Sequence, residues 1–546
     1  MKQLRFALVL MLALVLTACQ ALPTAGPVTG FERDIPNSES LVLKGFGPVE
    51  DAPPDVIVRD FLRASAAGWS DDFQVARAYL TEDAKAAWRP ETQVQIYSDD
   101  QTPNMISEDG KVQVSVAVGG VVTPDGKYAM QAKPSNVHLD YNLVQNADGQ
   151  WRIDRLPDGV LISQSSFHAV YTLASVYFLS PDMTALVPDP RWYPGRRLAS
   201  YLMQGLIEGP SPQIATAVVS AVPAGARLPL QQVEVFGGRA EVRLEGEDLS
   251  TPEQQSAFKW QVNATLMQVP SVSEVSIRNN ETSLDDVSVP AGPAWAMDSR
   301  AGISKDGLVL NDGSEPVLMA PIDEMGKSPR DPSVGPVDSS PLAFISGDQL
   351  YGVHQAMEPR AIYTADNLSR PSVDRLGWIW TTTGNKVVVA SLYTNTPIAL
   401  PSPWTSGDPL RAIAITPDGA RALLLRGGPD GSVWYAGVKR SADGTPIGLD
   451  SPSRIEVEKG KILDASWAGN TSALILQEGA EQRQVTISTL ASLPETLRAP
   501  ADAVRISGGA TPQSILLGNG EGAVYSRSGA SWRNETSVLQ GETYPH

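Results

Sequence analysis

One side chain of this sequence combines chemical reactivity with a telling position, and it is the thiol of Cys19. Cys19 is the only cysteine among 546 residues, so no second thiol is available for an intrachain disulfide. Lys2 and Arg5 precede an apolar stretch over residues 6–16, and small residues lead up to the thiol. This order is that of a secretory signal peptide, with an apolar part too short to cross a bilayer as a helix. A buried structural cysteine is the alternative, which the position of Cys19 disfavours.

The run Leu16-Thr17-Ala18-Cys19 resembles a bacterial lipobox. The resemblance implies cleavage between Ala18 and Cys19, after which Cys19 becomes an N-palmitoyl, S-diacylglycerol cysteine. Residues 1–18 are then a signal peptide. Residues 19–50 are predicted to be a lipidated tether, because prolines and glycines interrupt any hydrophobic period there. We therefore expect attachment to the extracytoplasmic face of the cell membrane through lipid.

Histidines and carboxylates, the other usual carriers of chemistry, form no recognisable pattern. The four histidines are His138, His168, His354 and His546, and no pair has the i, i+4 spacing of a metal-binding helix. His138 alternates with apolar neighbours, which predicts a surface or half-buried strand position. His354 could line a channel in the C-terminal part, but one histidine makes no site. We expect no catalytic residue, no metal and no cofactor.

Two glycine-containing stretches imitate nucleotide-binding loops. Gly326-Lys327-Ser328 ends like a phosphate loop, yet Pro321 stands where the motif requires glycine and Pro329 follows where a helix should start. Residues 518–522 lie between two apolar runs, which favours a hairpin turn. Trp378 and Trp380 share one face of a predicted strand, and we expect core packing there rather than ligand stacking.

The charge balance of the chain argues against one class of partner, nucleic acid. The chain has 61 acidic residues against 43 lysines and arginines, for a net charge of −18. Such a chain lacks the basic clusters that release counterions from nucleic acid, so we expect no nucleic-acid partner. With no disulfide, stability must come from hydrophobic cores, for which an apolar fraction of 42% is ample.

Residues 51–165 have the pattern of an α+β domain. Helical periods run over residues 55–66 and 72–80, and Val112 to Val118 then alternate as in a strand. After the turn Thr123-Pro124-Asp125-Gly126, further strands are predicted at 127–132, at 137–144 and from Trp151. The pattern resembles the cone-shaped NTF2-like domains.

Residues 169–286 predict a second α+β domain. Its elements are a strand at 175–179, a helix with Leu198, Leu202 and Leu206 that ends at Gly209-Pro210, a hairpin over 233–244, a helix from Ser250-Thr251-Pro252-Glu253 and a strand at 272–277. Ser250 and Glu253 have capping-box spacing. The runs Leu206-Ile207-Glu208-Gly209-Pro210 and Ala221-Val222-Pro223-Ala224-Gly225 resemble the GerMN module.

After a linker over residues 287–300, the chain reads as strands to its end. Four stretches at 374–392, 410–438, 461–487 and 503–527 each hold two or three strands, and two less regular ones lie at 302–310 and 346–353. Thr416-Pro417-Asp418-Gly419 resembles the Ser-Pro-Asp-Gly turn of propeller blades. Starts about 40–50 residues apart are typical of four-stranded blades. We expect residues 301–546 to form an all-β propeller of six blades, one for each stretch. A pair of β-sandwiches is the alternative.

The order of lipobox, NTF2-like domain, GerMN module and propeller resembles the LpqB family of actinobacterial lipoproteins. The resemblance implies a lipoprotein without enzymatic activity. Its role would be that of an accessory to the membrane sensor histidine kinase MtrB in cell-envelope and division control, with the kinase ectodomain as protein partner. Two other functions stay open on the residues alone. They are a lipid-anchored propeller hydrolase or lactonase, and a cell-wall glycan-binding protein.

Replacing Cys19 by alanine is expected to abolish lipid attachment and to leave the protein unprocessed or released. Two acyl chains anchor a protein stably, and the variant would carry none. Metabolic labelling with a fatty acid, followed by membrane fractionation, checks this. Ser38→Ala in the tether is the matched control and should remain labelled and membrane-bound. A fatty-acid label that persists on the Cys19→Ala protein would contradict the assignment.

Overall fold

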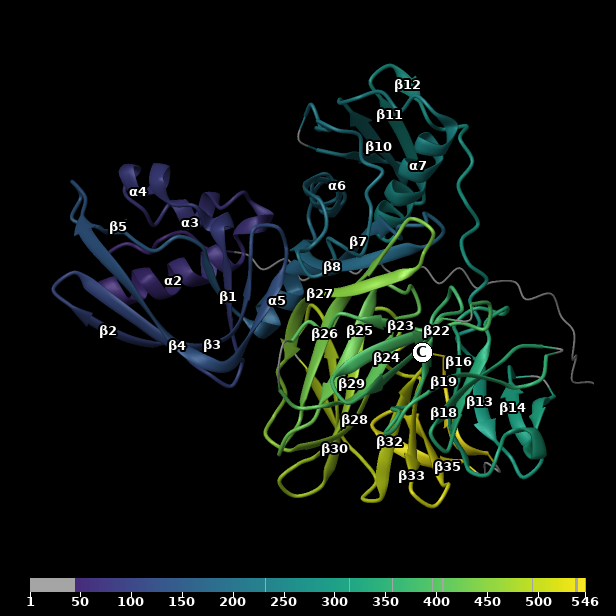
Figure 1. Ribbon diagram of the computed structural model, residues 1–546. Coiled ribbons are helices and arrows are strands. Elements are labelled where there is room, and N and C mark those ends of the chain that lie inside the picture. The colour runs from purple at the N-terminus through teal and green to yellow at the C-terminus, as the bar shows by residue number, and fades with distance from the viewer. Residues whose placement is uncertain are drawn as a thin grey trace, which may run out of the picture. The chain divides into compact units, whose positions relative to one another are not determined.

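The computed structural model describes residues 45–545, with gaps at 231, 314, 356, 395, 405–406, 493 and 536–538. Residues 43–546 belong to one compact unit. Three domains follow one another within it, coloured purple, teal and green to yellow in Figure 1. Ala18, Cys19, the signal peptide and residues 19–44 of the tether lie outside the described residues.

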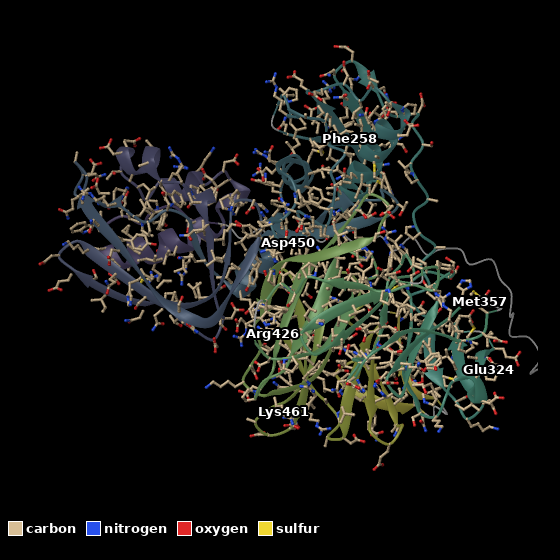
Figure 2. All side chains as sticks on the ribbon, viewed as in Figure 1. Phe258, Glu324, Met357, Arg426, Asp450 and Lys461 are labelled. Carbon is tan, nitrogen blue, oxygen red and sulfur yellow. The ribbon has the colours of Figure 1, made fainter. Side chains whose placement is uncertain are left out.

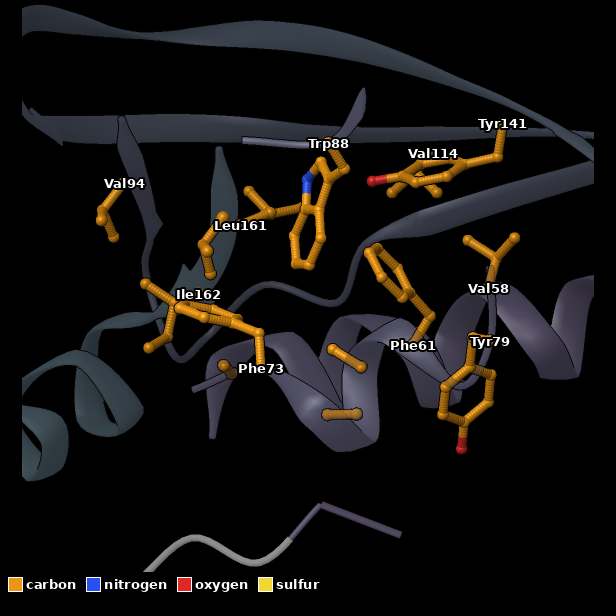
Figure 3. Packing of buried hydrophobic residues seen from close by; sticks show 14 of the residues in the cluster. Val58, Phe61, Phe73, Tyr79, Trp88, Val94, Val114, Tyr141, Leu161 and Ile162 are labelled. Atoms are coloured by element: carbon orange, nitrogen blue, oxygen red, sulfur yellow. The ribbon is translucent and has the colours of Figure 1, made fainter. Parts of the chain in front are cut away.

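The N-terminal domain packs a long helix, α2 (Pro54–Ala66), against a twisted sheet. Pro54 and Asp55 occupy the first turn, where a missing N–H costs nothing and a carboxylate complements the helix dipole. Phe61 on the buried face meets Tyr79, Trp88 and Tyr141 edge to face, with ring centroids 5.3–6.4 Å apart. Figure 3 shows this aromatic core.

The sheet of this domain has the order β5-β4-β3-β1-β6, and β2 pairs with β3. Its strands are β1 (Val94–Tyr97), β2 (Asn104–Glu108), β3 (Lys111–Val122), β4 (Tyr128–Gln145), β5 (Trp151–Arg155) and β6 (Val160–Ser163), and its short helices are α3 (Gln74–Arg77), α4 (Glu82–Ala87) and α5 (Gln164–Val170).

Two local predictions for this domain were wrong. The strands expected at 127–132 and 137–144 are one strand, β4, because β3 supplies a partner along its whole length with one register shift between Val118 and Gly120. The helix expected over 72–80 shrinks to the four residues of α3. Phe73 adopts a left-handed φ of 60° at its start, and Leu80 forms a bridge to Ile153 at its end.

The middle domain joins a β-hairpin to a four-stranded sheet and two helices. Its elements are β7 (Tyr171–Leu179), β8 (Leu186–Pro194), α6 (Leu198–Glu208), β9 (Glu234–Phe236), β10 (Arg239–Leu244), α7 (Pro252–Leu266), β11 (Glu274–Asn279) and β12 (Thr282–Ser283). β10 and β11 run parallel, which requires a crossover connection, and α7 provides it. Phe258 of α7 is fully buried in the core and is labelled in Figure 2.

The capping box of α7 lies one residue later than expected. Thr251, not Ser250, is the N-cap, and Gln254, not Glu253, closes the box. Pro252 is the reason, because proline occupies the first helical position and holds the residue before it in extended conformation.

Beyond Arg300 the described strands form six four-stranded antiparallel sheets. The first sheet consists of β13 (Arg300–Ile303), β14 (Gly307–Asn311), β15 (Val317–Pro321) and β36 (Gln540–Thr543), and the second of β16 (Pro329–Val334), β17 (Leu342–Ser346), β18 (Gln349–Val353) and β19 (Arg360–Thr364). The third consists of β20 (Ser372–Val373), β21 (Ile379–Thr383), β22 (Lys386–Ala390) and β23 (Ile398–Leu400), and the fourth of β24 (Leu410–Ile415), β25 (Arg421–Arg426), β26 (Ser432–Arg440) and β27 (Pro446–Ile455). The fifth consists of β28 (Lys461–Ala468), β29 (Ser472–Glu478), β30 (Arg483–Thr489) and β31 (Glu495–Arg498), and the sixth of β32 (Ala503–Gly508), β33 (Ile515–Asn519), β34 (Val524–Ser528) and β35 (Ser531–Glu535).

These sheets are arranged as a propeller. The inner strands β36, β16, β20, β24, β28 and β32 contact one another in succession. β36, at the end of the chain, pairs with β13 at the start of the domain. This pairing closes the ring between the first and last segments of the propeller and removes an open sheet edge.

A fragment of residues 296–546 is expected to be soluble and rich in β structure by circular dichroism. The reason is that β36 closes the ring within the fragment itself. Ending the fragment at residue 535 removes β36, leaves β13 without that partner, and should lower the melting temperature. A strong helical signal from the longer fragment, or equal melting temperatures for the two, would refute this account.

Candidate functional site: a shared strand, a closed axis and two grooves

The described histidines are not brought together. His138 is exposed on β4, and His354 follows β18, the third strand of its sheet, with Nε2 3.2 Å from the Ser339 carbonyl oxygen. His354 therefore does not line the propeller axis, which the inner strands surround. Within residues 45–545, gaps aside, no group of three or more His, Cys, Asp or Glu side chains is placed to hold a metal ion.

The sequence imitations of binding motifs have structural roles. Pro329 begins β16, so a strand follows Gly326-Lys327-Ser328 where a phosphate loop would need a helix. Of the glycine-rich stretch 518–522, Gly518 and Asn519 end β33, and residues 520–523 connect β33 to β34. Trp380 is fully buried and donates its indole N–H to Asp374 Oδ2 at 3.0 Å, and Trp378 packs against the same core.

The propeller axis is crossed by a buried ion pair. Arg370, just before β20 of the third sheet, lies 3.1 Å from Asp464 on β28 of the fifth. Its guanidinium also donates to the carbonyl oxygens of Ala465 and of Ile506, the latter on the sixth sheet. Both side chains are less than a tenth exposed. Because the third and sixth sheets lie opposite each other in a six-sheet ring, this arginine spans the interior.

Strand β8 of the middle domain contacts the N-terminal domain through the turn Thr123-Pro124-Asp125-Gly126. The backbone N–H of Trp192 donates to the Gly126 carbonyl oxygen at 2.8 Å, and the Tyr193 hydroxyl donates to the Asp125 carbonyl oxygen at 3.2 Å. A Cβ atom at Gly126 would come within 2.9 Å of the Trp192 oxygen, and φ there is +79°. Only glycine fits this approach without strain.

The β7–β8 hairpin also contacts the propeller, beside a second copy of the same tetrapeptide, Thr416-Pro417-Asp418-Gly419. Arg421, which is 1% exposed, pairs with Asp418 and donates to the Pro188 carbonyl oxygen at 2.6 Å. Arg375 donates to the Asp418 carbonyl oxygen and pairs with Asp182, in the turn between β7 and β8, at 2.6 Å. Both turns thus dock on one hairpin.

β8 is itself held in the middle domain by a buried pair. Arg191 lies 2.8 Å from Asp189, with side chains 1% and 5% exposed. Nη1 and Nη2 of Arg191 also donate to the carbonyl oxygens of Gly205 and Gly209, whereas its Nε–H is buried without a hydrogen-bond partner. Ser211 donates its N–H and hydroxyl to Asp189. The Glu-Gly-Pro sequence after α6 is thereby explained, since Gly209 turns at φ +96° to offer its carbonyl to Arg191.

These ion pairs were missed at the level of sequence. The repeated Thr-Pro-Asp-Gly tetrapeptide was the available signal, because each copy predicts a turn with the same internal hydrogen bond from threonine to aspartate. Nothing in the spacing of the two copies indicates a common strand between them.

Two open grooves lie on the described domains. One, of about 750 Å³, lies on the middle domain beside Arg197, Tyr201, Arg227 and Pro229. The other, of about 760 Å³, lies on the N-terminal domain between residues 45–49, α2 and the segment after β1. In the part of the chain that the structure describes, no helix is both long and apolar enough to cross a membrane.

Three known protein families match successive parts of the chain. The family described as "Lipoprotein LpqB, N-terminal domain" matches residues 47–168, "Sporulation and spore germination" (Germane) matches residues 175–285, and "Lipoprotein LpqB beta-propeller domain" matches residues 306–545. The fold and these matches define a multidomain lipoprotein with a Germane domain and a C-terminal propeller.

Two curated relatives extend the match over most of the chain. Lipoprotein LpqB of Thermobifida fusca is 24% identical and covers 88% of each chain. Lipoprotein LpqB of Mycolicibacterium smegmatis is 26% identical and covers 86% of this chain and 85% of its own. Two family models of lipoprotein LpqB thus match parts of this chain, and relatives of that name match it over most of its length. Among solved structures, TolB from Acinetobacter baumannii is similar at 12% identity and a TM-score of 0.35, over 71% of this chain and 90% of TolB.

Asp182→Asn is expected to lower the free energy of unfolding at neutral pH by about 1–3 kcal/mol, the cost of losing a charged hydrogen bond. The melting temperature should fall accordingly. Burial alone would raise the pKa of Asp182, but hydrogen bonds from Arg375 and Ser180 and the Arg375 charge hold it well below its ordinary value of 3.8. The ionised form therefore stabilises the fold fully above pH 3.8, and this contribution is lost as the pH falls further.

Melting curves of both proteins between pH 7 and pH 2 check this sign. The difference between wild type and Asp182→Asn should shrink as the pH falls below about 3.8. Asp306→Asn, at an exposed pair with Lys305, is the control and should change little at any pH. A difference that grows on acidification would contradict the assignment.

Proposed function

We propose that this protein is an extracytoplasmic lipoprotein, anchored through Cys19, that acts by binding the ectodomain of a membrane sensor histidine kinase and thereby tunes its signalling. The anchor is supported by the lipobox Leu16-Thr17-Ala18-Cys19 and by the lipoprotein name of the relatives. The kinase, of the MtrB type, comes from the family resemblance.

The observation that favours a binding function over an enzymatic one is the Arg370–Asp464 pair across the propeller axis. A propeller hydrolase or lactonase would need convergent carboxylates or a cation facing an open channel. Here the Asp464 carboxylate is instead engaged by Arg370 and by the Ile506 N–H at 2.9 Å. The relatives also carry no enzymatic name.

The glycan-binding alternative requires tryptophans gathered on an exposed face. Among the described residues, Trp295, at 42%, is the one tryptophan in the set of exposed large apolar side chains. Trp380 and Trp467 are buried, and Trp404 and Trp434 pack edge to face in a blade core. This distribution favours protein binding.

Recovery of the kinase from solubilised membranes tests the proposal. Full-length protein should retain the kinase, whereas a truncation that keeps residues 1–50 should keep the anchor and lose the kinase. Confinement of both molecules to one membrane raises their effective concentration. The pull-down should therefore be done in nanodiscs, which keep a membrane, as well as in mild detergent. Equal recovery with both proteins, or robust hydrolysis of a glycan, lactone or ester by residues 20–546, would overturn the binding function.

A further inference from the structure

A small cavity lies beside the Arg370–Asp464 pair, between the sixth sheet of the propeller and the closing strand β36. Its volume is about 50 Å³, and its walls come from β32, β33 and β36 together with Asp331 and Arg370. One water molecule needs about 10–15 Å³ of such space. The cavity therefore has room for a few water molecules or for one small chemical group, and it is too small for a nucleotide or a sugar.

One hydrogen-bond donor in the wall of this cavity has no partner. Arg370 is 7% exposed, and its Nη atoms donate to Asp464 and to the carbonyl oxygens of Ala465 and Ile506. Its Nε–H is buried without a hydrogen-bond partner among the described residues. No buried side-chain oxygen in the described part of the wall lacks a partner in this way. Because a buried donor without a partner is costly, the wall favours an occupant that accepts hydrogen bonds.

The ion pairs around the cavity leave one positive charge over. Among the described residues they contain four arginines and three carboxylates, namely Arg300, Arg330, Arg370 and Arg505 with Asp331, Asp464 and Glu542. Asp331 is shared, because Arg505 lies 2.8 Å from one of its oxygens and Arg330 contacts the other. The two arginines and two carboxylates of the wall itself cancel, and the surplus charge comes from the groups behind it. The occupant is therefore an acceptor that also carries negative charge.

The second arginine of the wall is open to solvent. The side chain of Arg505 is 49% exposed, and among the described residues it donates to Asp331 alone, through Nη2. Its Nε and Nη1 hydrogens remain for a ligand. The wall thus has one arginine at its open side and one at its buried side, and a carboxylate has two oxygens with which to accept from both.

We propose that this cavity binds a single carboxylate group, supplied by a small organic acid or by the C-terminus of a peptide, with the Arg370 Nε–H and Arg505 as donors. Hydrogen bonds between a guanidinium and a carboxylate are short and strong, and the planar fork of arginine matches the carboxylate plane. The inference goes beyond the proposed function and does not depend on the kinase.

The test uses residues 20–546 and sodium acetate as the probe. Acetamide is the neutral counterpart, and sodium chloride keeps the total salt at about 0.1 M, so that general screening is constant. Acetate should raise the melting temperature saturably, because a ligand that binds only the folded protein stabilises it. In NMR spectra of protein labelled with ¹⁵N at the arginine Nε atoms, one slowly exchanging signal should move with the same dissociation constant.

Two variants locate the site. Arg505→Gln removes the exposed donor, and Gly518→Ala adds a methyl group to the wall, where its Cβ would lie 3.5 Å from the Arg505 Cβ, an ordinary contact. Each should weaken acetate binding about tenfold, the scale of a lost charged hydrogen bond. The controls are Arg411→Gln, at an exposed arginine outside the cavity wall, and Gly520→Ala, with no atom near its Cβ. Both controls should bind acetate like the wild type.

A short peptide separates the two sources of the carboxylate. Acetyl-glycyl-glycine with a free C-terminus should bind more tightly than acetate if the ligand is a chain end, and more weakly if it is a small acid. Its C-terminal amide should not bind in either case. An equal response to acetate and acetamide, saturation by chloride alone, or unchanged acetate affinity in both Arg505→Gln and Gly518→Ala would overturn the inference. So would the absence of any saturable response, which would leave the cavity to water only.

Discussion

Strand β8 is the element on which the arrangement of the described domains depends. Its residues Pro188, Trp192 and Tyr193 bond to the propeller or to the N-terminal domain, and Asp189 and Arg191 between them hold the middle domain together. The Trp192 indole N–H also donates to the Ala491 carbonyl oxygen in the propeller. One nine-residue strand thus makes contacts in all three domains, so a change in its register would move contacts in each of them.

The buried ion pairs share one chemical design. Arg191, Arg370, Arg421 and Arg440 each pair with an aspartate and spend other guanidinium hydrogens on backbone carbonyl oxygens. Burying two charges is costly, and the hydrogen bonds offset the cost only in part, because the Nε–H groups of Arg191, Arg370 and Arg421 have no hydrogen-bond partner among the described residues. Arginine suits this task because its planar fork presents five donors. Such pairs add little net stability, but removing one partner leaves an uncompensated buried charge and costs about 3–5 kcal/mol.

Local pattern predicted much of the fold. The helix at α2, the alternation of β3 and the blade stretches follow from periods that need no distant partner. The continuous β4 and the short α3 did not follow, because β3 and Ile153, respectively, decide where those elements begin and end. The lipobox around Cys19 is local and readable. The β8 contacts join residues 68 and 299 positions apart, as in Tyr193–Asp125 and Trp192–Ala491, and no spacing rule reaches that far.

The two Thr-Pro-Asp-Gly turns have the same internal hydrogen bonds but make different contacts with their surroundings. In each, the threonine carbonyl accepts from the glycine N–H, which leaves the aspartate and glycine carbonyls free to point outward. At 123–126 those carbonyls accept from β8 directly, whereas at 416–419 they accept from Arg375 and Arg440. The hairpin therefore donates directly to the carbonyl oxygens of the first turn, whereas beside the second turn Arg375 and Arg421 make the contacts with it.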